Sequence, residues 1–182
     1  MEYRSFYDYL KQTDLDNGKL RIDADIEPTN VSDWISSIQI MDGIPAVKSI
    51  TVEINSPGGE VYSALALHDA IKGCKKHVTV LCVGLAASAA AMIVLQAGHR
   101  RAMTINSTLI LHEVRQWADG NVPLGDAEDN IAESRRLQEV VYSIMERSTG
   151  KSREELEELV SRKTVYLDAP GALEYGLVDE IE

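Results

Sequence analysis

Residues 49–59 read SITVEINSPGG, and residues 78–97 read VTVLCVGLAASAAAMIVLQA. The first stretch alternates apolar and polar side chains and then runs into a Pro-Gly-Gly sequence, a pattern typical of a strand that ends in a tight loop. The second stretch has a β-branched strand pattern over residues 78–83, a break at Gly84, and an alanine-rich helical segment over residues 86–96. A helical spacing of apolar residues also follows the first loop, so both stretches predict a strand, a turn and a helix in succession.

Further elements continue this order along the rest of the chain. We expect a strand at residues 108–111, the longest helix at residues 126–147, a capped helix at residues 153–160 and a terminal strand at residues 177–181. Strands that alternate with helices favour parallel pairing through right-handed crossovers, with the helices covering the sheet. The sequence thus predicts the α/β class and a single domain over residues 1–182.

The composition excludes several classes of partner. The 182 residues carry a formal net charge of -11, and basic residues occur in dispersed pairs such as Lys75-Lys76, so the clustered Lys and Arg of a nucleic-acid site are missing. The most apolar stretch, residues 83–97, is shorter than the roughly 20 residues that span a bilayer. Residues 1–12 lack the basic-then-apolar order of a secretory signal. We therefore expect no nucleic-acid or membrane partner, and a cytoplasmic location.

The two cysteines, Cys74 and Cys82, have neither CxxC spacing nor a histidine cluster beside them. Isolated thiols of this kind are typical of a reducing compartment. We expect reduced thiols, no metal ion and no cofactor.

A hydroxyl, an imidazole and two glycines fall at positions suited to acyl transfer. Ser88 follows a strand and a glycine turn at the start of a helix, whose N-terminal dipole favours negative charge nearby. His112 ends an apolar strand, where α/β sheets line their clefts, and could take the proton of a serine hydroxyl. Gly58 and Gly59, at another strand end, could present N–H groups to a developing oxyanion.

Each of these features alone is commonly structural. Serines pack in alanine-rich helices, histidines at strand ends form hydrogen bonds, and glycine pairs make turns. Their combination in one chain is what favours a catalytic site.

The same residues resemble a known family, the proteolytic subunit of the Clp protease (ClpP, peptidase family S14). Residues 54–59 (INSPGG) and 84–88 (GLAAS) are similar to its signature loops. Residues 4–6 (RSF) look like its start, residues 106–107 (NS) precede the strand that reaches the histidine, and residues 174–179 (EYGLVD) look like its C-terminal motif. The resemblance covers nearly the whole chain, and it extends to phage-type ClpP-like proteases that process capsid or scaffold proteins.

The resemblance implies a ClpP/crotonase-like fold with repeated β-β-α and β-α units, a parallel sheet flanked by helices, and a protruding handle helix within residues 113–147. It implies Ser88 as the nucleophile and His112 as the general base. The backbone N–H groups of Gly59 and Ala89 match the family's oxyanion hole.

The family's third catalytic residue, an aspartate, matches Thr164 here, and Lys163 is the alternative if a neighbouring gap shifts the alignment. Neither side chain is acidic. A threonine hydroxyl could accept a hydrogen bond from His112 Nδ1, but it supplies no charge to stabilise an imidazolium. Asp168 is a further candidate for the acid, although an N-cap role in the last helix is the simpler interpretation.

The function implied by the resemblance is that of a serine endopeptidase that degrades unfolded proteins or short peptides through an acyl-enzyme on Ser88. The family forms heptameric rings, stacked in pairs as a tetradecamer, and an apolar side on the long helix would suit a contact between subunits. A Clp-type AAA+ ATPase is a further implied partner. The chain looks short of the N-terminal hairpin that helps such ATPases dock, so this partner is left open.

Two other functions stay open on the sequence alone. A catalytically weak or inactive subunit of a mixed ring would account for the missing aspartate. A crotonase-like acyl-CoA enzyme shares the fold and the oxyanion loop, but it needs no Ser–His pair and usually carries acidic catalytic residues instead.

Overall fold

The computed structural model describes residues 13–115 and 123–182. Its strands are β1 (Thr13–Asp14), β2 (Lys19–Ile22), β3 (Ser49–Ser56), β4 (His77–Ala87), β5 (Arg100–Met103), β6 (Thr108–Leu111), β7 (Val165–Leu167) and β8 (Glu180–Ile181). Its helices are α2 (Pro28–Gly43), α3 (Val61–Lys72), the π-helical η1 (Ala90–Val94), the 3₁₀ turn η2 (Leu95–Ala97), α4 (Leu124–Thr149), α5 (Arg153–Val160) and α6 (Ala169–Glu174).

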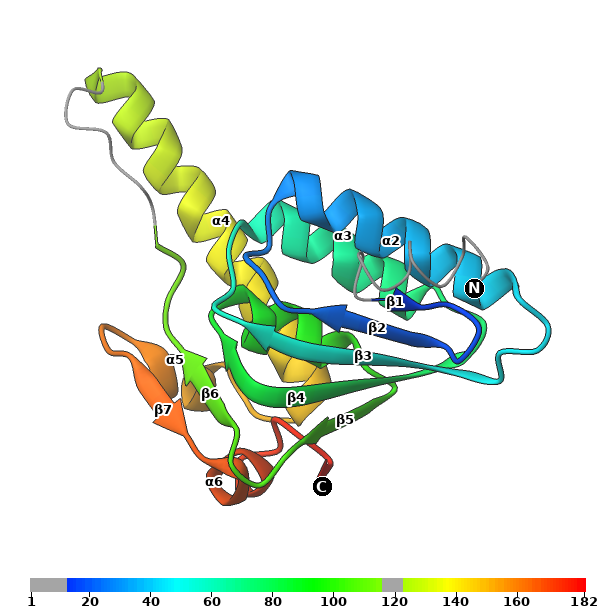
Figure 1. Ribbon diagram of the computed structural model, residues 1–182. Helices are drawn as coiled ribbons and strands as arrows, with labels where there is room; N and C mark the ends of the chain where they lie inside the picture. The colour runs from blue at the N-terminus through cyan, green and yellow to red at the C-terminus, as the bar shows by residue number, and fades with distance from the viewer. Residues whose placement is uncertain (1–12, 116–122) are drawn as a thin grey trace.

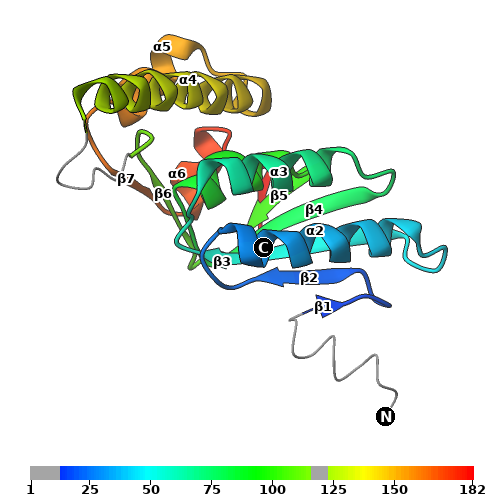
Figure 2. The same ribbon diagram turned by 90° about the horizontal axis from the view of Figure 1, so that it is seen from above.

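One mainly parallel sheet organises these elements. Its order is β1-β2-β3-β4-β5-β8, and β6 pairs with β4 on one side and with β7 on the other. The β1–β2 and β6–β7 pairs are antiparallel, and the other pairs are parallel. Helices α2 and α3 cover one face of the sheet (Figures 1 and 2). The predicted α/β class, with a parallel sheet flanked by helices, is confirmed.

The strand β4 continues past the point where the sequence indicated its end. We expected it to stop before Gly84, but Gly84 adopts φ 90° and the strand bends there and runs on to Ala87. Before the bend, residues 79–82 pair with β5, and after it residues 85–87 pair with β6. The expectation was wrong because a glycine at positive φ can turn a strand without ending its hydrogen bonding.

The helix expected over residues 86–96 is correspondingly shorter and irregular. Ala86 and Ala87 belong to β4, and η1 begins only at Ala90. The N–H of Leu95 bonds to Ala90 O five residues back, which is the π-helical pattern, and a single 3₁₀ turn follows. Alanine-rich composition favours helix, but strand pairing with β6 outweighs that propensity for its first residues.

The long helix α4 is the predicted handle. In Figure 1 its first turns, in yellow-green, extend away from the rest of the molecule. Its buried side chains all lie in its second half, which packs against η1 and α5, whereas Leu124 is 77% and Ile131 is 48% exposed. The helix α5 has the expected capping box between Ser152 and Glu155, with both reciprocal hydrogen bonds present.

Some sequence expectations fall elsewhere or were missed. The family-like start at residues 4–6 and part of the segment before the handle, residues 116–122, lie outside the described residues. The terminal strand is shorter than expected, because only Glu180–Ile181 pairs with β5. The sequence reading also left β2 and α2 unassigned. Within the described ranges, no helix is long and apolar enough to cross a membrane.

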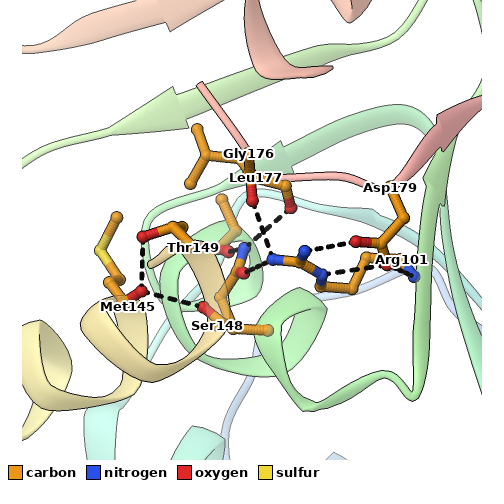
Figure 3. Close-up of polar contacts among 9 residues, drawn as sticks. Arg101, Met145, Ser148, Thr149, Gly176, Leu177 and Asp179 are labelled. Atoms are coloured by element: carbon orange, nitrogen blue, oxygen red, sulfur yellow. Dashed lines mark hydrogen bonds and ion pairs between the residues drawn. The ribbon is translucent and has the colours of Figure 1, made fainter. Parts of the chain in front are cut away.

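A buried arginine joins the C-terminal turn to the body. Arg101, on β5, donates to both carboxylate oxygens of Asp179 and to Gly176 O (Figure 3). It also donates to Gln96 Oε1, and Gln96 in turn donates to Leu177 O. Burial by itself would raise the pKa of Asp179, but the hydrogen bonds and charge of Arg101 outweigh it and hold that pKa below its ordinary value.

Replacing Asp179 with asparagine tests this anchor. A fully buried pair that loses one partner costs 3 to 5 kcal/mol; because the Asp179 side chain is 43% exposed, we expect about 1 to 2 kcal/mol at pH 7. The depressed pKa stabilises the fold above the ordinary carboxyl pKa, and this contribution is lost as the pH falls through the folded-state value. The difference in stability between wild type and Asp179→Asn, measured by thermal unfolding, should therefore become smaller below about pH 4.

The control for this prediction is Glu182→Gln, which removes an exposed partner of Arg100. It should change stability by less than about 0.5 kcal/mol. An Asp179→Asn protein as stable as wild type at pH 7 would contradict the role given to the anchor.

Candidate active site

The bend of β4 brings Ser88 beside the end of β6. Ala87 pairs with Ile110, and the N–H of the next residue, Ser88, donates to Ile110 O at 2.8 Å. The Ser88 carbonyl accepts from the N–H groups of Ala91 and Met92, so both the N–H and the C=O of Ser88 are hydrogen-bonded. Ser88 itself adopts φ 53°, an uncommon and strained conformation outside glycine. The serine is thus held at a sharp turn between a strand and a helix.

His112 follows directly after β6 and lines the same cleft as Ser88. Its Nδ1 lies 2.6 Å from the carbonyl oxygen of Glu113. Because a carbonyl can only accept, Nδ1 carries the hydrogen, and Nε2 of the neutral ring keeps its lone pair. Ser88 and His112 are not hydrogen-bonded to each other in the described structure. In ligand-free sites such bonds are often long and tighten when substrate binds.

The glycine loop after β3 forms the other side of the site. Gly58 O accepts from Ile26 N–H, and Glu60 N–H donates to Ile26 O, which makes a parallel bridge around Gly59. In such a bridge the N–H of Gly59 points away from Ile26, and Gly59 lines the cleft together with Ser88 and Ala89. The loop can therefore present a backbone donor on the side where the serine lies.

Close packing explains why both loop positions are glycine. A Cβ on Gly58 would lie 2.4 Å from Ala87 O and 2.9 Å from Ser88 Cβ, and one on Gly59 would lie 2.2 Å from Ile26 O. Both glycines also have positive φ, 95° and 151°. The loop and the turn at Ser88 therefore fit against each other backbone to backbone.

The cleft has a volume of about 630 Å³ and a largely apolar wall. Met92 and Ile93 line it from η1, and Leu137 and Val141 line it from α4. At its rim the hydroxyl of Tyr62 bonds to Glu133, whose other partner is Arg136. Together Arg136 and Tyr62 lower the pKa of Glu133 to about 2. This network, which sequence reasoning missed, links α3 to the handle α4 across the cleft.

Thr164, the residue at the family's acid position, does not contact His112 Nδ1. Its Oγ1 accepts a hydrogen bond from Arg115 Nη2 at 3.0 Å. Thr164 and Lys163 line a second cavity, of about 310 Å³, of which His112 is also a wall. The acceptor that we expected from the Thr164 hydroxyl is instead the backbone carbonyl of Glu113.

Asp168 lies at the start of α6, where its carboxylate accepts from Gly171 N–H at 2.9 Å. This is the N-cap interaction that was the simpler interpretation of the sequence. No hydrogen bond in the described structure joins Asp168 to His112, so its carboxylate is already used as a helix cap.

Fold and cleft together define a class of protein: an α/β candidate acyl-transfer hydrolase, with a serine, a histidine and glycine-loop amides in one cleft. A family model described as Clp protease matches residues 3–182. The chain therefore belongs to the Clp protease family, and it is a peptidase.

Individual relatives agree with this family. The chain is 33% identical over 159 residues to ATP-dependent Clp protease proteolytic subunit 1 of Corynebacterium glutamicum, covering 86% of this chain and 74% of that protein. It is 31% identical to subunit 1 of Thermobifida fusca, over 88% and 72% of the two chains. It is also 35% identical to the chloroplastic subunit 3 of Arabidopsis thaliana, over 81% of this chain and 47% of that protein.

The fit between the glycine loop and the Ser88 turn can be tested with Gly58→Ala. The added methyl would collide with Ala87 O, a backbone atom that cannot move aside cheaply, at a position with φ 95°. We expect a loss of about 1 to 3 kcal/mol in the free energy of unfolding, measured by urea denaturation.

The matched control is Gly43→Ala, because nothing lies within 4 Å of a Cβ at Gly43. At this helical position alanine should leave stability unchanged or raise it by up to about 1 kcal/mol. Equal effects of the two substitutions would show that the contact with the Ser88 turn is not what requires glycine.

Proposed function

We propose that this chain is a serine endopeptidase that cleaves peptide bonds in unfolded proteins or short peptides through an acyl-enzyme on Ser88. One observation carries the proposal: the pairing of Ala87 with Ile110 puts Ser88 and His112 at neighbouring strand ends, where both line one cleft. Family membership supports the same reaction.

In this mechanism His112 Nε2 takes the proton of the Ser88 hydroxyl as Oγ attacks the carbonyl carbon of the scissile peptide bond. The N–H groups of Gly59 and Ala89 donate to the oxyanion that forms. The imidazolium then gives its proton to the leaving amine, and the acyl-enzyme remains on Oγ. Water, deprotonated by His112, hydrolyses that ester and restores both residues.

We further propose that the chain works as a heptameric ring, stacked in pairs, in the cytoplasm. The exposed apolar side chains on the first turns of α4, Leu124 and Ile131, support a contact with another copy. The free thiols Cys74 and Cys82 are compatible with a reducing compartment. A Clp-type AAA+ ATPase is the partner that the family suggests for delivering unfolded chains to such a chamber.

A second candidate is a catalytically weak or inactive subunit of a mixed ring. It is favoured by Thr164 at the acid position and by the absence, in the described structure, of a Ser88–His112 hydrogen bond. The crotonase-like alternative has no such support, since the family match is to Clp protease.

Hydrolysis of a short fluorogenic peptide tests the catalytic proposal. Ser88→Ala and His112→Ala should each lower the rate by at least about a thousandfold, because the two groups act as one unit. Ser36→Ala and His77→Ala, both at exposed positions, are the matched controls and should keep wild-type rates. A rate that survives Ser88→Ala would end the proposal, and a wild type without activity or Ser88 labelling by a fluorophosphonate would favour the inactive subunit.

Native mass measurement tests the ring. We expect seven or fourteen times the 20.1 kDa of one chain. Ile131→Asp, which puts a charge on the handle, should shift a double ring toward single rings. Ile40→Asp is the control, because Ile40 has the same 48% exposure on α2. A monomer at micromolar concentration would rule out the ring.

A further inference from the structure

If Thr164 is the third catalytic residue, the site lacks the negative charge that an aspartate would supply. When His112 accepts the serine proton it becomes a cation, and a neighbouring carboxylate stabilises that cation and so lowers the barrier. Thr164 offers no charge, and its oxygen is occupied by the Arg115 guanidinium. Asp168 is occupied as the N-cap of α6. The charge would therefore have to come from another carboxylate near His112.

Glu113 is the carboxylate that the structure places there. It lines the 310 Å³ cavity whose walls also include His112 and Thr164. Its Oε2 accepts a hydrogen bond of 3.1 Å from the N–H of Arg162, two residues before Thr164. The side chain is therefore tied to the segment that carries the acid in the family pattern, although Glu113 itself comes from the histidine's own segment.

We propose that Glu113 replaces the missing aspartate as a positioning residue for His112, with the two tasks of the acid divided between its backbone and its side chain. The carbonyl oxygen holds Nδ1–H at 2.6 Å and fixes the tautomer and the ring orientation. The carboxylate, held by Arg162 N–H, supplies the negative charge. This inference rests on the proposed peptidase reaction of Ser88 and His112.

The local backbone is consistent with a segment shaped to hold this carboxylate. Arg162 adopts φ 54°, one of two non-glycine residues with positive φ in the described ranges; the other is Ser88. Strained residues of this kind persist only where surrounding contacts fix them. At Arg162 the N–H is used by Glu113 and the N–H of the next residue, Lys163, bonds to Val160 O.

Charged groups of both signs line the two cavities that His112 borders. In the second cavity, the groups beside Glu113 are the cations Arg115, Arg162 and Lys163. Glu113 and Arg115 also line the cleft, where the other ionisable groups besides His112 are Asp25, Glu27, Glu60 and Tyr62. Among the described residues that line the second cavity, Glu113 is the one carboxylate, and its charge offsets those of the three cations there.

The variant Glu113→Gln removes the charge and keeps the backbone carbonyl, the side-chain length and an acceptor for Arg162 N–H. We expect kcat for the fluorogenic peptide to fall about tenfold, the equivalent of one pKa unit of lost interaction, with KM changed less than about twofold. The acid limb of kcat/KM should move to lower pH by about 0.5 to 1 unit, because the imidazolium loses a stabilising charge. Glu158→Gln, at an exposed position on α5, is the control for charge removal, and it should change neither kcat nor the acid limb.

A rescue experiment distinguishes a positioning role of Glu113 from a purely structural one. Thr164→Asp in the Glu113→Gln background puts a carboxylate at the family's acid position, and it should restore most of the lost kcat and return the acid limb toward higher pH. Thr164→Asp alone should preserve or raise activity, and Glu113→Asp should keep part of it. Thermal unfolding of each variant checks that the fold is intact.

The outcomes are distinguishable from failure of the proposed function. If wild type hydrolyses the peptide and fluorophosphonate labels Ser88, but Glu113→Gln keeps wild-type kcat and pH profile, only this inference is wrong. The inference is also wrong if kcat of Glu113→Gln falls, the acid limb of its pH profile does not move and Thr164→Asp fails to restore the rate. If Ser88 is never labelled and wild type is inactive, the peptidase proposal itself fails.

Discussion

The hydrogen bond from Gly84 N–H to the Ser107 hydroxyl, 2.7 Å long, lies where β4 leaves β5 and begins to pair with β6. Ser107 is buried, and its Oγ also donates to Cys82 O, so one side chain holds both sides of the bend. On the opposite side of β4 the register with β3 shifts between Ile54 and Ser56. Without this bend the last residues of β4 would not reach β6, and Ser88 and His112 would end on separated strands.

The remaining parts of the site depend on that placement. The glycine loop can approach the Ser88 turn because Gly58 has no side chain, which would collide with Ala87 O and Ser88 Cβ. The helix η1 then begins at Ala90, and the buried Gln96 donates to Ala91 O and accepts from Arg101. Arg101 in turn bonds to Gly176 O and Asp179 of the C-terminal turn (Figure 3). Strand pairing, loop packing and the buried polar cluster therefore together hold Ser88 in its strained conformation.

At Thr164, which matches the family's aspartate, the backbone position resembles the family pattern while the side-chain contacts differ. The backbone around Thr164 still borders the histidine, yet its hydroxyl binds an arginine. A carbonyl can fix an imidazole as well as a carboxylate can, but it carries no full charge. Orientation and charge compensation are thus separable requirements, and adjacent groups of one residue, Glu113, can meet both.

Local patterns in the sequence determined the α/β class, strand β6, the capping box of α5 and the long helix. They also singled out Ser88, His112 and Gly59, which line one cleft in the fold. Helix α2 could have been predicted as well, since Val31, Trp34, Ile38 and Met41 recur at helical spacing. Three features could not have been predicted: the course of β4 beyond Gly84, the π-helical geometry of η1 and the partner of His112 Nδ1. Each of these depends on hydrogen bonds between segments distant in the chain, or on which of several acceptors a folded backbone brings within reach. Only the tertiary structure decides such choices, because local propensities of a fraction of a kcal/mol are outweighed by long-range pairing.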